Sequence, residues 1–371
     1  MISNRTVLAI LFAASSFILA CGDEGSADNE LSSRATAFGI SGGPNSYRTT
    51  REAWKQLLDV TTESGASMIH IQPLGWREAE PEPGQFNFSD FDQFFAIRDG
   101  YSLNYTLDIG TPMGISRTDL PEDLDFVSFR DPEMVRRYRA YVAATLGKFN
   151  KPTHVILHTE TASTFLADDP QGFAAYCDLL ASTADYVRSL SPKSKVGIYA
   201  TSYDSAEALN QMGRNTDFFS FGYNADRGEH NHKQILERLY AAAGGKRIGI
   251  HEIGIPTAAR VGGSEAAQVA FVNLIFDLAA QHADRLEFMS YYQAFDEDPA
   301  VTSVWLPAAF PDWSDEMQQD GLAWFGSLGL HRFDGAPKPA WTTFKQRVKE
   351  FKRSATSTPA LQSSTGKTLA R

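Results

Sequence analysis

The sequence is poor in cysteine and has no excess of positive charge, and each shortage excludes a class of function. Its 371 residues include only two cysteines, Cys21 and Cys177. At most one disulfide can therefore form, and a metal site built from four cysteines is excluded. Asp and Glu outnumber Lys and Arg by 45 to 34, for a formal net charge of −11. A nucleic-acid-binding face needs basic residues to neutralise phosphates, so neutral or cationic partners are favoured.

Motifs that bind nucleotides or metal ions are also missing. No GxGxxG or P-loop pattern follows the first predicted strand, so a nucleotide-binding sheet loses its main support. His251-Glu252 begins like the HExxH zinc motif, but Ile255 stands where the second histidine belongs. Residues 158–160 begin like the HxE motif of zinc deaminases, but no Pro-Cys-x-x-Cys follows. We therefore expect no metal and no other cofactor.

The N-terminus carries the pattern of an export signal. Residues 1–20 hold Arg5, a short apolar run and small residues, and the stretch is too short to favour a permanent membrane span. Ile18-Leu19-Ala20-Cys21 resembles the bacterial lipobox. The resemblance implies that Cys21 is lipidated and holds the protein in the bacterial cell envelope. With Cys21 lipidated, Cys177 is left as an unpaired, unreactive thiol on a helix. A plain signal peptide is the alternative.

The rest of the chain divides into a tether, one domain and a tail. Residues 21–36 are polar and lack periodicity, which is typical of a flexible tether. Residues 352–371 are rich in Ser and Thr and lack aromatic residues, so they are expected to be disordered. Residues 37–351 are predicted to form one catalytic domain.

Within this domain, apolar runs alternate with amphipathic stretches, which is the pattern of βα units. Helix-start signals include a capping box at Thr50, an Asp131-Pro132 pair and Ser264. Eight strands with interposed helices predict an α/β fold with a single (β/α)8 TIM barrel. The predicted strands are Ala37 to Ile40, Met68 to Gln72, Leu103 to Ile109, His154 to His158, Val196 to Ala200, Phe218 to Gly222, Ile248 to Ile253 and Phe288 to Tyr292.

Two glutamates end predicted strands at the side where such barrels carry their chemistry. Glu160 follows the fourth strand and Glu252 lies on the seventh. Strands four and seven of an eight-stranded barrel face each other across its mouth, so a substrate can sit between the two carboxyl groups. One protonated and one ionised carboxyl group are what glycoside hydrolysis requires. Alternatively, each glutamate pairs with an arginine such as Arg77 or caps a loop.

The arrangement resembles the clan A glycoside hydrolases, a superfamily of retaining β-glycosidases that includes galactanases and cellulases. The similar segments are Trp76–Phe88 with Phe91-Asp92, His251–Thr257, and Gly329-Leu330 with Asp334–Ala340. The resemblance covers residues 37 to about 348 and implies that Glu160 is the acid/base and Glu252 the nucleophile. Two departures concern the sugar contacts: Thr159 replaces the asparagine that usually precedes the acid/base, and His70 replaces arginine on strand two.

Further residues at the predicted mouth are candidates for substrate contacts. Trp76 and Trp305 can stack on sugar rings or pack within loops. By the resemblance, Tyr223 hydrogen-bonds the nucleophile; otherwise it is a tyrosine at the rim. His251 is expected to face the helices, because it alternates with Glu252. The predicted substrate-binding set is Trp76, Asp108, His158, Tyr223, Tyr292 and Trp305.

The sequence thus predicts a lipid-anchored, exported, monomeric glycoside hydrolase that cleaves β-glycosidic bonds with retention and binds no nucleic acid. Two alternatives remain open. One is a non-catalytic, surface-anchored carbohydrate-binding barrel, and the other is a metal-dependent barrel enzyme that acts on sugars.

Overall fold

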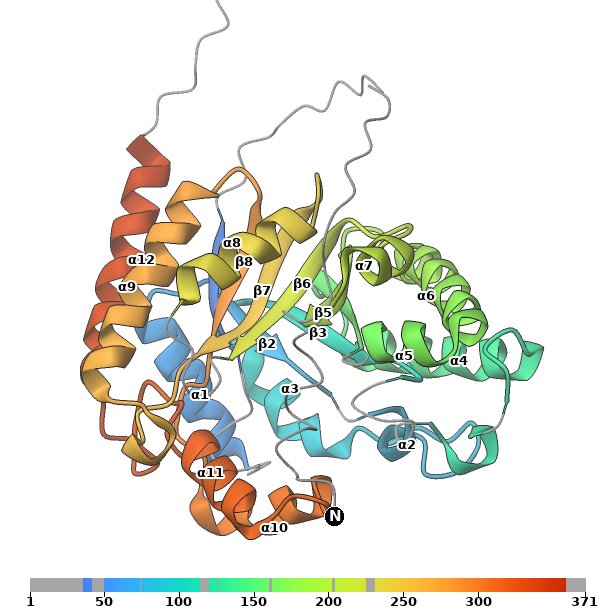
Figure 1. Ribbon diagram of the computed structural model, residues 1–371, viewed down its shortest axis with the longest axis horizontal. Helices are drawn as coiled ribbons and strands as arrows, with labels where there is room; N and C mark the ends of the chain where they lie inside the picture. The colour runs from blue at the N-terminus through green and yellow to red at the C-terminus, as the bar shows by residue number, and fades with distance from the viewer. Residues whose placement is uncertain are drawn as a thin grey trace, which may run out of the picture. The chain divides into compact units, whose positions relative to one another are not determined.

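A computed structural model of the chain describes residues 36–41, 50–73, 75–113, 120–125, 127–159, 162–201, 204–224 and 231–357. Eight parallel strands form a closed barrel in sequence order, and β8 closes it by pairing with β1 (Figure 1). The predicted TIM barrel is therefore confirmed. The strands are β1 (Ala37–Ser41), β2 (Met68–Ile71), β3 (Asn104–Gly110), β4 (His154–His158), β5 (Lys195–Thr201), β6 (Phe218–Asn224), β7 (Arg247–Gly254) and β8 (Leu286–Tyr292).

Helices surround the barrel, and the predicted start signals cap three of them. Side-chain oxygens of Thr50, Asp131 and Ser264 accept hydrogen bonds from backbone N–H groups in the first turns of α1, α4 and α9. The α-helices are α1 (Arg51–Glu63), α2 (Trp76–Ala79), α3 (Asp92–Arg98), α4 (Pro132–Lys148), α5 (Ala162–Asp168), α6 (Pro170–Leu190), α7 (Ala206–Met212), α8 (His232–Ala242), α9 (Glu265–Gln281), α10 (Pro299–Ala309), α11 (Asp315–Phe325) and α12 (Pro339–Ser357).

Two sequence predictions can be compared with these bounds. Helix α12 continues to Ser357, so the predicted start of the disordered tail at residue 352 is too early. Cys177 lies buried on α6, as expected for an unreactive thiol, and burial raises its pKa to about 12. Cys21 and the predicted export signal lie outside the described residues. Among those residues, no helix has the length and apolar character needed to cross a membrane.

The barrel interior has an apolar layer of its own. Side chains from β2, β4, β5, β6 and β8 meet there, and strands that are not neighbours can bring side chains together only inside the barrel. Glycine makes room for the large rings: a Cβ on Gly249 would lie 2.4 Å from the ring of Phe288. The layer consists of Met68, Ile156, Tyr199, Phe218 and Phe288.

A buried ion cluster lies beneath this layer, at the N-terminal ends of the strands. Glu287 on β8 receives contacts from His154 at 3.1 Å, from Lys195 and from Arg247. Burial alone would raise the pKa of Glu287, but the hydrogen bonds from His154 and Lys195 outweigh it and lower the pKa to about 2. The cluster therefore ties together four strands at the end of the barrel away from the predicted chemistry.

Candidate active site

The candidate site lies at the C-terminal ends of the strands, where α10 and α11 follow β8 and lie together at one end of the barrel (Figure 1). Glu252 is on β7, at a bulge. Phe221 pairs with Ile250, but the next residue of β6, Gly222, pairs with Glu252. One extra residue, His251, is thus inserted into β7.

The bulge determines where Glu252 points. Paired residues on parallel strands share a face of the sheet, so Glu252 shares the face of Gly222. A Cβ on Gly222 would lie 2.4 Å from Oη of Tyr199, which belongs to the layer inside the barrel. Glu252 is therefore on the inner wall of the barrel, half-buried, close to the end of its strand.

The predicted partner of Glu252 cannot be placed in the same way. Strand β4 ends at His158, whose backbone pairs with Gly110. Thr159 is buried and donates a hydrogen bond from Oγ1 to the carbonyl of Met113 at 2.7 Å. Glu160 follows directly but lies outside the described residues, so its role as acid/base stays a prediction. The same holds for the predicted sugar contact of the His158 side chain.

The expected orientation of His251 is wrong. Its imidazole lies inside the barrel, fully buried, with Nδ1 2.9 Å from Oγ of Ser220 and its ring centroid 4.5 Å from that of Tyr199. The prediction assumed strict alternation along β7, and the bulge breaks that alternation because it places two consecutive residues opposite one residue of β6.

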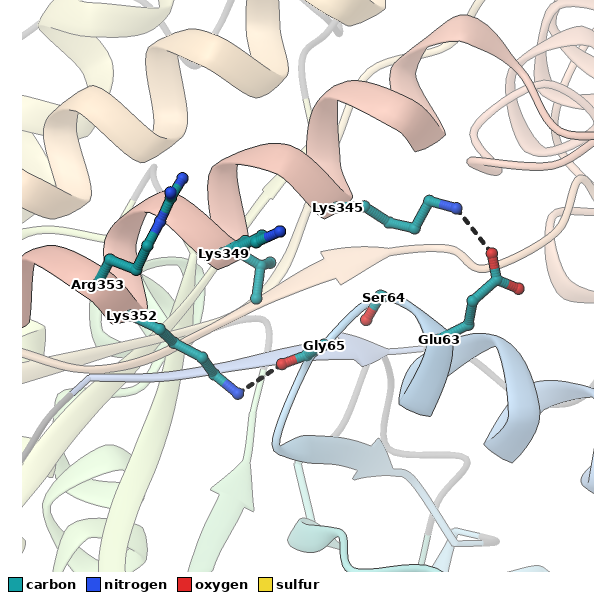
Figure 2. A pocket seen from close by; sticks show the side chains of 8 residues that line it. Glu63, Ser64, Gly65, Lys345, Lys349, Lys352 and Arg353 are labelled. Carbon is teal, nitrogen blue, oxygen red and sulfur yellow. Dashed lines mark hydrogen bonds and ion pairs between the residues drawn. The ribbon is translucent and has the colours of Figure 1, made fainter.

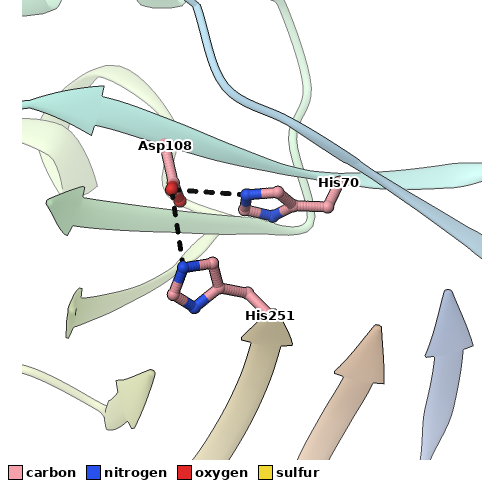
Figure 3. A group of neighbouring side chains, drawn as sticks. All are labelled: His70, Asp108 and His251. Carbon is pink, nitrogen blue, oxygen red and sulfur yellow. Dashed lines mark ion pairs between the residues drawn. The ribbon is translucent and has the colours of Figure 1, made fainter. Parts of the chain in front are cut away.

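Asp108 and His70 lie beside His251, and the three side chains point toward one another from β3, β2 and β7 (Figure 3). Oδ2 of Asp108 is 3.3 Å from Nε2 of His70 and 3.9 Å from Nε2 of His251. Asp108 was predicted to contact substrate, but it is only 1% exposed. It therefore lies below the surface that a sugar can reach in this conformation, and it contacts histidines instead.

Trp76 does not lie at the mouth surface, contrary to one of the two predicted possibilities. It is fully buried, and its ring packs on Tyr138 and Tyr141 of α4. Its indole Nε1 donates a 2.6 Å hydrogen bond to Oε2 of Glu80. Stacking on a sugar ring is therefore not available to Trp76, and the alternative of loop packing is correct.

Glu80 gives the segment around Trp76 its shape. Its other carboxylate oxygen accepts hydrogen bonds from the backbone N–H of Gly84 at 2.5 Å and from Nε of Arg137 at 3.2 Å. Gly84 has a φ of 77°, in the left-handed region that favours glycine. The Trp, Glu-Pro and Pro-Gly segment thus folds the connection between β2 and α3 around one buried carboxylate.

Tyr223 faces away from the barrel interior. It is 2% exposed, its hydroxyl lies 2.7 Å from Nδ1 of His232, and its ring stacks near Phe271 of α9. The expected orientation toward the nucleophile is wrong, because inward positions on β6 are held by Ser220 and Gly222 and the alternation turns Tyr223 toward the helices.

Two predicted aromatic contacts remain at the mouth. Tyr292 is the last residue of β8, pairs with Ser41 of β1 and is half-buried. Trp305 lies on α10, half-buried, and its Nε1 donates a 3.2 Å hydrogen bond to Glu297. Both residues are therefore partly exposed, which the predicted sugar contact requires.

The sequence did not predict an ionic cluster beside these aromatics. Nζ of Lys338 lies 2.6 Å from Oδ1 of Asp296, and both side chains are buried. Burial raises the pKa of Asp296 to about 6, against the opposing effect of Lys338. The pair, with Glu297, Ser327 and Arg332, lines a pocket of about 400 Å³. The acidic dipeptide Asp296-Glu297, so soon after β8, was the sequence signal for this cluster.

A larger pocket of about 540 Å³ lies elsewhere, between the end of α1 and helix α12 (Figure 2). Lys345 pairs with Glu63 at 2.7 Å, and Lys352 donates to the carbonyl of Gly65. Gly65 precedes β2, so this pocket is at the N-terminal end of the strands. We therefore do not count it as part of the candidate active site.

Comparison with known proteins agrees with a glycosidase fold. Residues 44–118 match the family model Glyco_hydro_42, described as beta-galactosidase. No protein of curated function is significantly similar in sequence. Among solved structures, a GH5_18 variant from Streptomyces cattleya in complex with Manβ1-4GlcNAc is 17% identical, with a TM-score of 0.64 over 88% of this chain and 82% of that chain.

Two further solved structures share the fold. The exo-β-1,4-mannosidase Op5Man5 from Opitutaceae bacterium strain TAV5 is 14% identical, with a TM-score of 0.65 over 86% of this chain and 60% of that chain. Xylanase 10B from Thermotoga petrophila RKU-1, in complex with xylobiose, is 14% identical, with a TM-score of 0.57 over 89% of this chain and 99% of that chain. The family match to part of the chain supports a glycoside hydrolase, and the solved structures show that the chain shares the fold of these enzymes.

Proposed function

We propose that the protein is a retaining β-glycosidase in which Glu252 is the nucleophile and Glu160 the acid/base. The observation that carries the proposal is the position of Glu252, half-buried on the inner wall of a closed barrel at the C-terminal end of β7. Strand β4, which Glu160 follows, lies three strands away around the barrel and thus faces β7 across the mouth.

The chemistry of this pair is a double displacement. Glu252 attacks the anomeric carbon while Glu160 gives its proton to the departing glycosidic oxygen, and a glycosyl ester with Glu252 forms. Glu160, now ionised, takes a proton from water, and the resulting hydroxide attacks the anomeric carbon. The bond to Glu252 breaks, both carboxyl groups return to their starting states and the product keeps its β-configuration.

The proposed substrate is a β-1,4-linked oligo- or polysaccharide of neutral sugars. Neutral sugars suit a chain with a net charge of −11 better than anionic ones do. The β-1,4 linkage is the one named for a bound disaccharide and for a mannosidase among the structural neighbours. Tyr292 and Trp305 are both partly exposed, and their aromatic rings would be the contacts for the sugar rings.

The test begins with a panel of aryl β-glycosides and β-1,4-linked mannan, xylan and galactan. We expect release of aryl alcohol from at least one glycoside and no release from the α-anomers. Glu252→Gln and Glu160→Gln should each lower kcat by several orders of magnitude while the circular dichroism spectrum is unchanged. A folded protein that binds these glycans but hydrolyses none would instead be the non-catalytic carbohydrate-binding barrel. Turnover that survives Glu252→Gln and Glu160→Gln but is lost on treatment with a chelator would point to the metal-dependent alternative.

We also propose that Cys21 carries lipid and holds the barrel at a bacterial membrane. The proposal is supported by the lipobox-like segment Ile18–Cys21 at the end of an apolar stretch.

A further inference from the structure

The cluster of His70, Asp108 and His251 does not take part in the proposed hydrolysis, yet it is one of the most buried polar groups of the barrel. Its residues are 2%, 1% and 0% exposed. They come from three strands, β2, β3 and β7, and one donor atom from each lies within 4.8 Å of the other two. Figure 3 shows both imidazoles directed at the same carboxylate.

A contact between Nδ1 and a hydroxyl group fixes the orientation of each imidazole. Nδ1 of His70 lies 2.6 Å from Oγ1 of Thr106, and Nδ1 of His251 lies 2.9 Å from Oγ of Ser220. The hydroxyl oxygen can accept a hydrogen bond from Nδ1–H, and in that tautomer the lone pair of Nε2 is directed toward Asp108. Histidines that bind metal ions in proteins are usually oriented in this way, by a hydrogen bond to the nitrogen that does not bind.

The distances within the cluster can be compared with two arrangements. In one, the histidines donate hydrogen bonds directly to Asp108, and in the other, all three side chains bind one metal ion. A hydrogen bond between a charged N–H and a carboxylate is usually about 2.7–2.9 Å long. The two contacts to Oδ2 of Asp108 are longer, at 3.3 Å and 3.9 Å. Ligands held about 2.0–2.1 Å from a tetrahedral zinc ion are roughly 3.3 Å apart. The 3.3 Å contact of Asp108 with His70 matches that separation, and the 3.9 Å contact with His251 is longer.

The charge of the cluster also suits a cation. A carboxylate that is removed from water is costly unless a positive charge or several hydrogen bonds compensate for it. An imidazole that donates from Nδ1 offers the lone pair of Nε2 to an ion. A divalent ion would bind both lone pairs and the carboxylate together.

We propose that His70, Asp108 and His251 form a binding site for one divalent transition-metal ion, foremost zinc, inside the barrel. Two imidazoles and one carboxylate are ligands that zinc commonly takes. The ion would join β2, β3 and β7, and it would fix the bulge at His251 that precedes Glu252 along the chain. The site stands independently of the proposed hydrolysis, because it is defined by metal binding alone.

The test uses the full domain without a histidine tag, expressed in medium supplemented with zinc, and measures bound metal by mass spectrometry. We expect one zinc ion per chain. Removal of the ion by a chelator under mildly denaturing conditions should lower the melting temperature, and added Zn²⁺ should restore it. Co²⁺ bound in its place should give the visible absorption bands of a tetrahedral site.

Variants locate the ion. Asp108→Asn keeps the shape of the side chain but removes its charge, and His251→Gln removes one ligand. Each should weaken zinc binding by roughly a hundredfold or more, and neither melting temperature should respond to Zn²⁺. His331→Gln is the matched control, because His331 is also a buried histidine but bonds the carbonyl of Ala294. It should bind zinc like the unaltered protein.

Two results would overturn the proposal. One is unaltered protein that is folded but carries no stoichiometric metal after expression with zinc; this would assign the cluster to proton-mediated contacts. The other is zinc binding of equal strength in Asp108→Asn, which would place the ion elsewhere. Both results are independent of glycosidase activity, so the failure of the proposed function would leave the metal site untouched.

Discussion

Glu252 and Gly222 are paired across β7 and β6, and the missing side chain of Gly222 leaves space that is bounded by the hydroxyl of Tyr199. The pairing turns Glu252 to the inside of the barrel. A methyl group on residue 222 would meet Oη of Tyr199 at 2.4 Å, a distance at which something must shift. A side chain at position 222 would therefore displace Tyr199 or β6, the part of the barrel wall next to the proposed nucleophile.

The first prediction concerns this wall. Gly222→Ala should displace Tyr199 or β6 and lower the free energy of unfolding by about 1–3 kcal/mol, as overpacking does. A displacement of about 1 Å beside Glu252 should lower kcat/KM up to about a hundredfold. Urea unfolding and steady-state kinetics measure the two effects. Gly245→Ala is the control, because a Cβ there meets nothing within 4 Å, and it should change neither value.

The second prediction separates two tryptophans that looked alike in the sequence. Trp76→Phe removes the hydrogen bond to the buried Glu80 and should cost about 1–3 kcal/mol of stability. It should leave KM unchanged, because Trp76 is fully buried. Trp305→Ala should instead raise KM, and more for long substrates than for short ones. A raised KM in Trp76→Phe with normal stability would contradict the buried role.

The third prediction concerns acid stability. The pKa of Glu287 is about 2 in the folded protein, below the value of 4.5 that an ordinary glutamate has. The carboxylate therefore contributes stability that is complete above about pH 4.5 and is lost as the pH falls toward 2. The difference corresponds to at most about 3 kcal/mol. Between these pH values, Glu287→Gln should show a flatter decline of unfolding free energy than the unaltered protein.

The control for this comparison is Glu350→Gln. Glu350 lies on α12, and its side chain is 41% exposed. Its replacement should leave the slope of stability against pH as it is in the unaltered protein. Equal slopes for all three proteins would mean that the ion cluster at the N-terminal end of the barrel does not govern acid unfolding.

The fourth prediction tests the membrane anchor. Cys21→Ala removes the sulfur that would carry lipid, so the protein should move from the membrane fraction to the soluble fraction, with its activity on aryl glycosides preserved. Cys177→Ala is the matched control, because that thiol is buried on α6. It should stay with the membrane. Continued membrane association of Cys21→Ala would reject lipidation at this residue.

The strands and helix starts could be predicted because they depend on local pattern. Apolar runs such as residues 154–158 form strands wherever both faces are buried, and Thr50, Asp131 and Ser264 cap helices through bonds that span only two or three residues. The closed barrel then follows from the number and order of the strands. Nothing in that reasoning needs a contact between distant parts of the chain.

The side-chain orientations at the site depend on features that alternation does not reveal. A single bulge placed both His251 and Glu252 on the inner wall of the barrel, and the short helix α2 buried Trp76 against α4. The pairing of Asp296 with Lys338 joins residues 42 positions apart, which no local pattern indicates. The position of Glu252 at the end of β7 could be predicted. An acidic residue that ends an apolar strand indicates a functional site, whichever face of the sheet its neighbours are expected to occupy.

The last prediction distinguishes the two proposed catalytic glutamates by stereochemistry. Glu252→Ala should abolish turnover, and azide could then enter the vacated space and attack the anomeric carbon directly, giving an α-glycosyl azide of inverted configuration. Glu160→Ala should still form the glycosyl ester from dinitrophenyl glycosides, since that leaving group needs no proton. Azide would then attack the ester on Glu252 and give the β-glycosyl azide. Nuclear magnetic resonance of the anomeric proton identifies each product. A β-azide from Glu252→Ala would show that the two roles are reversed, because only a protein-bound ester preserves the configuration.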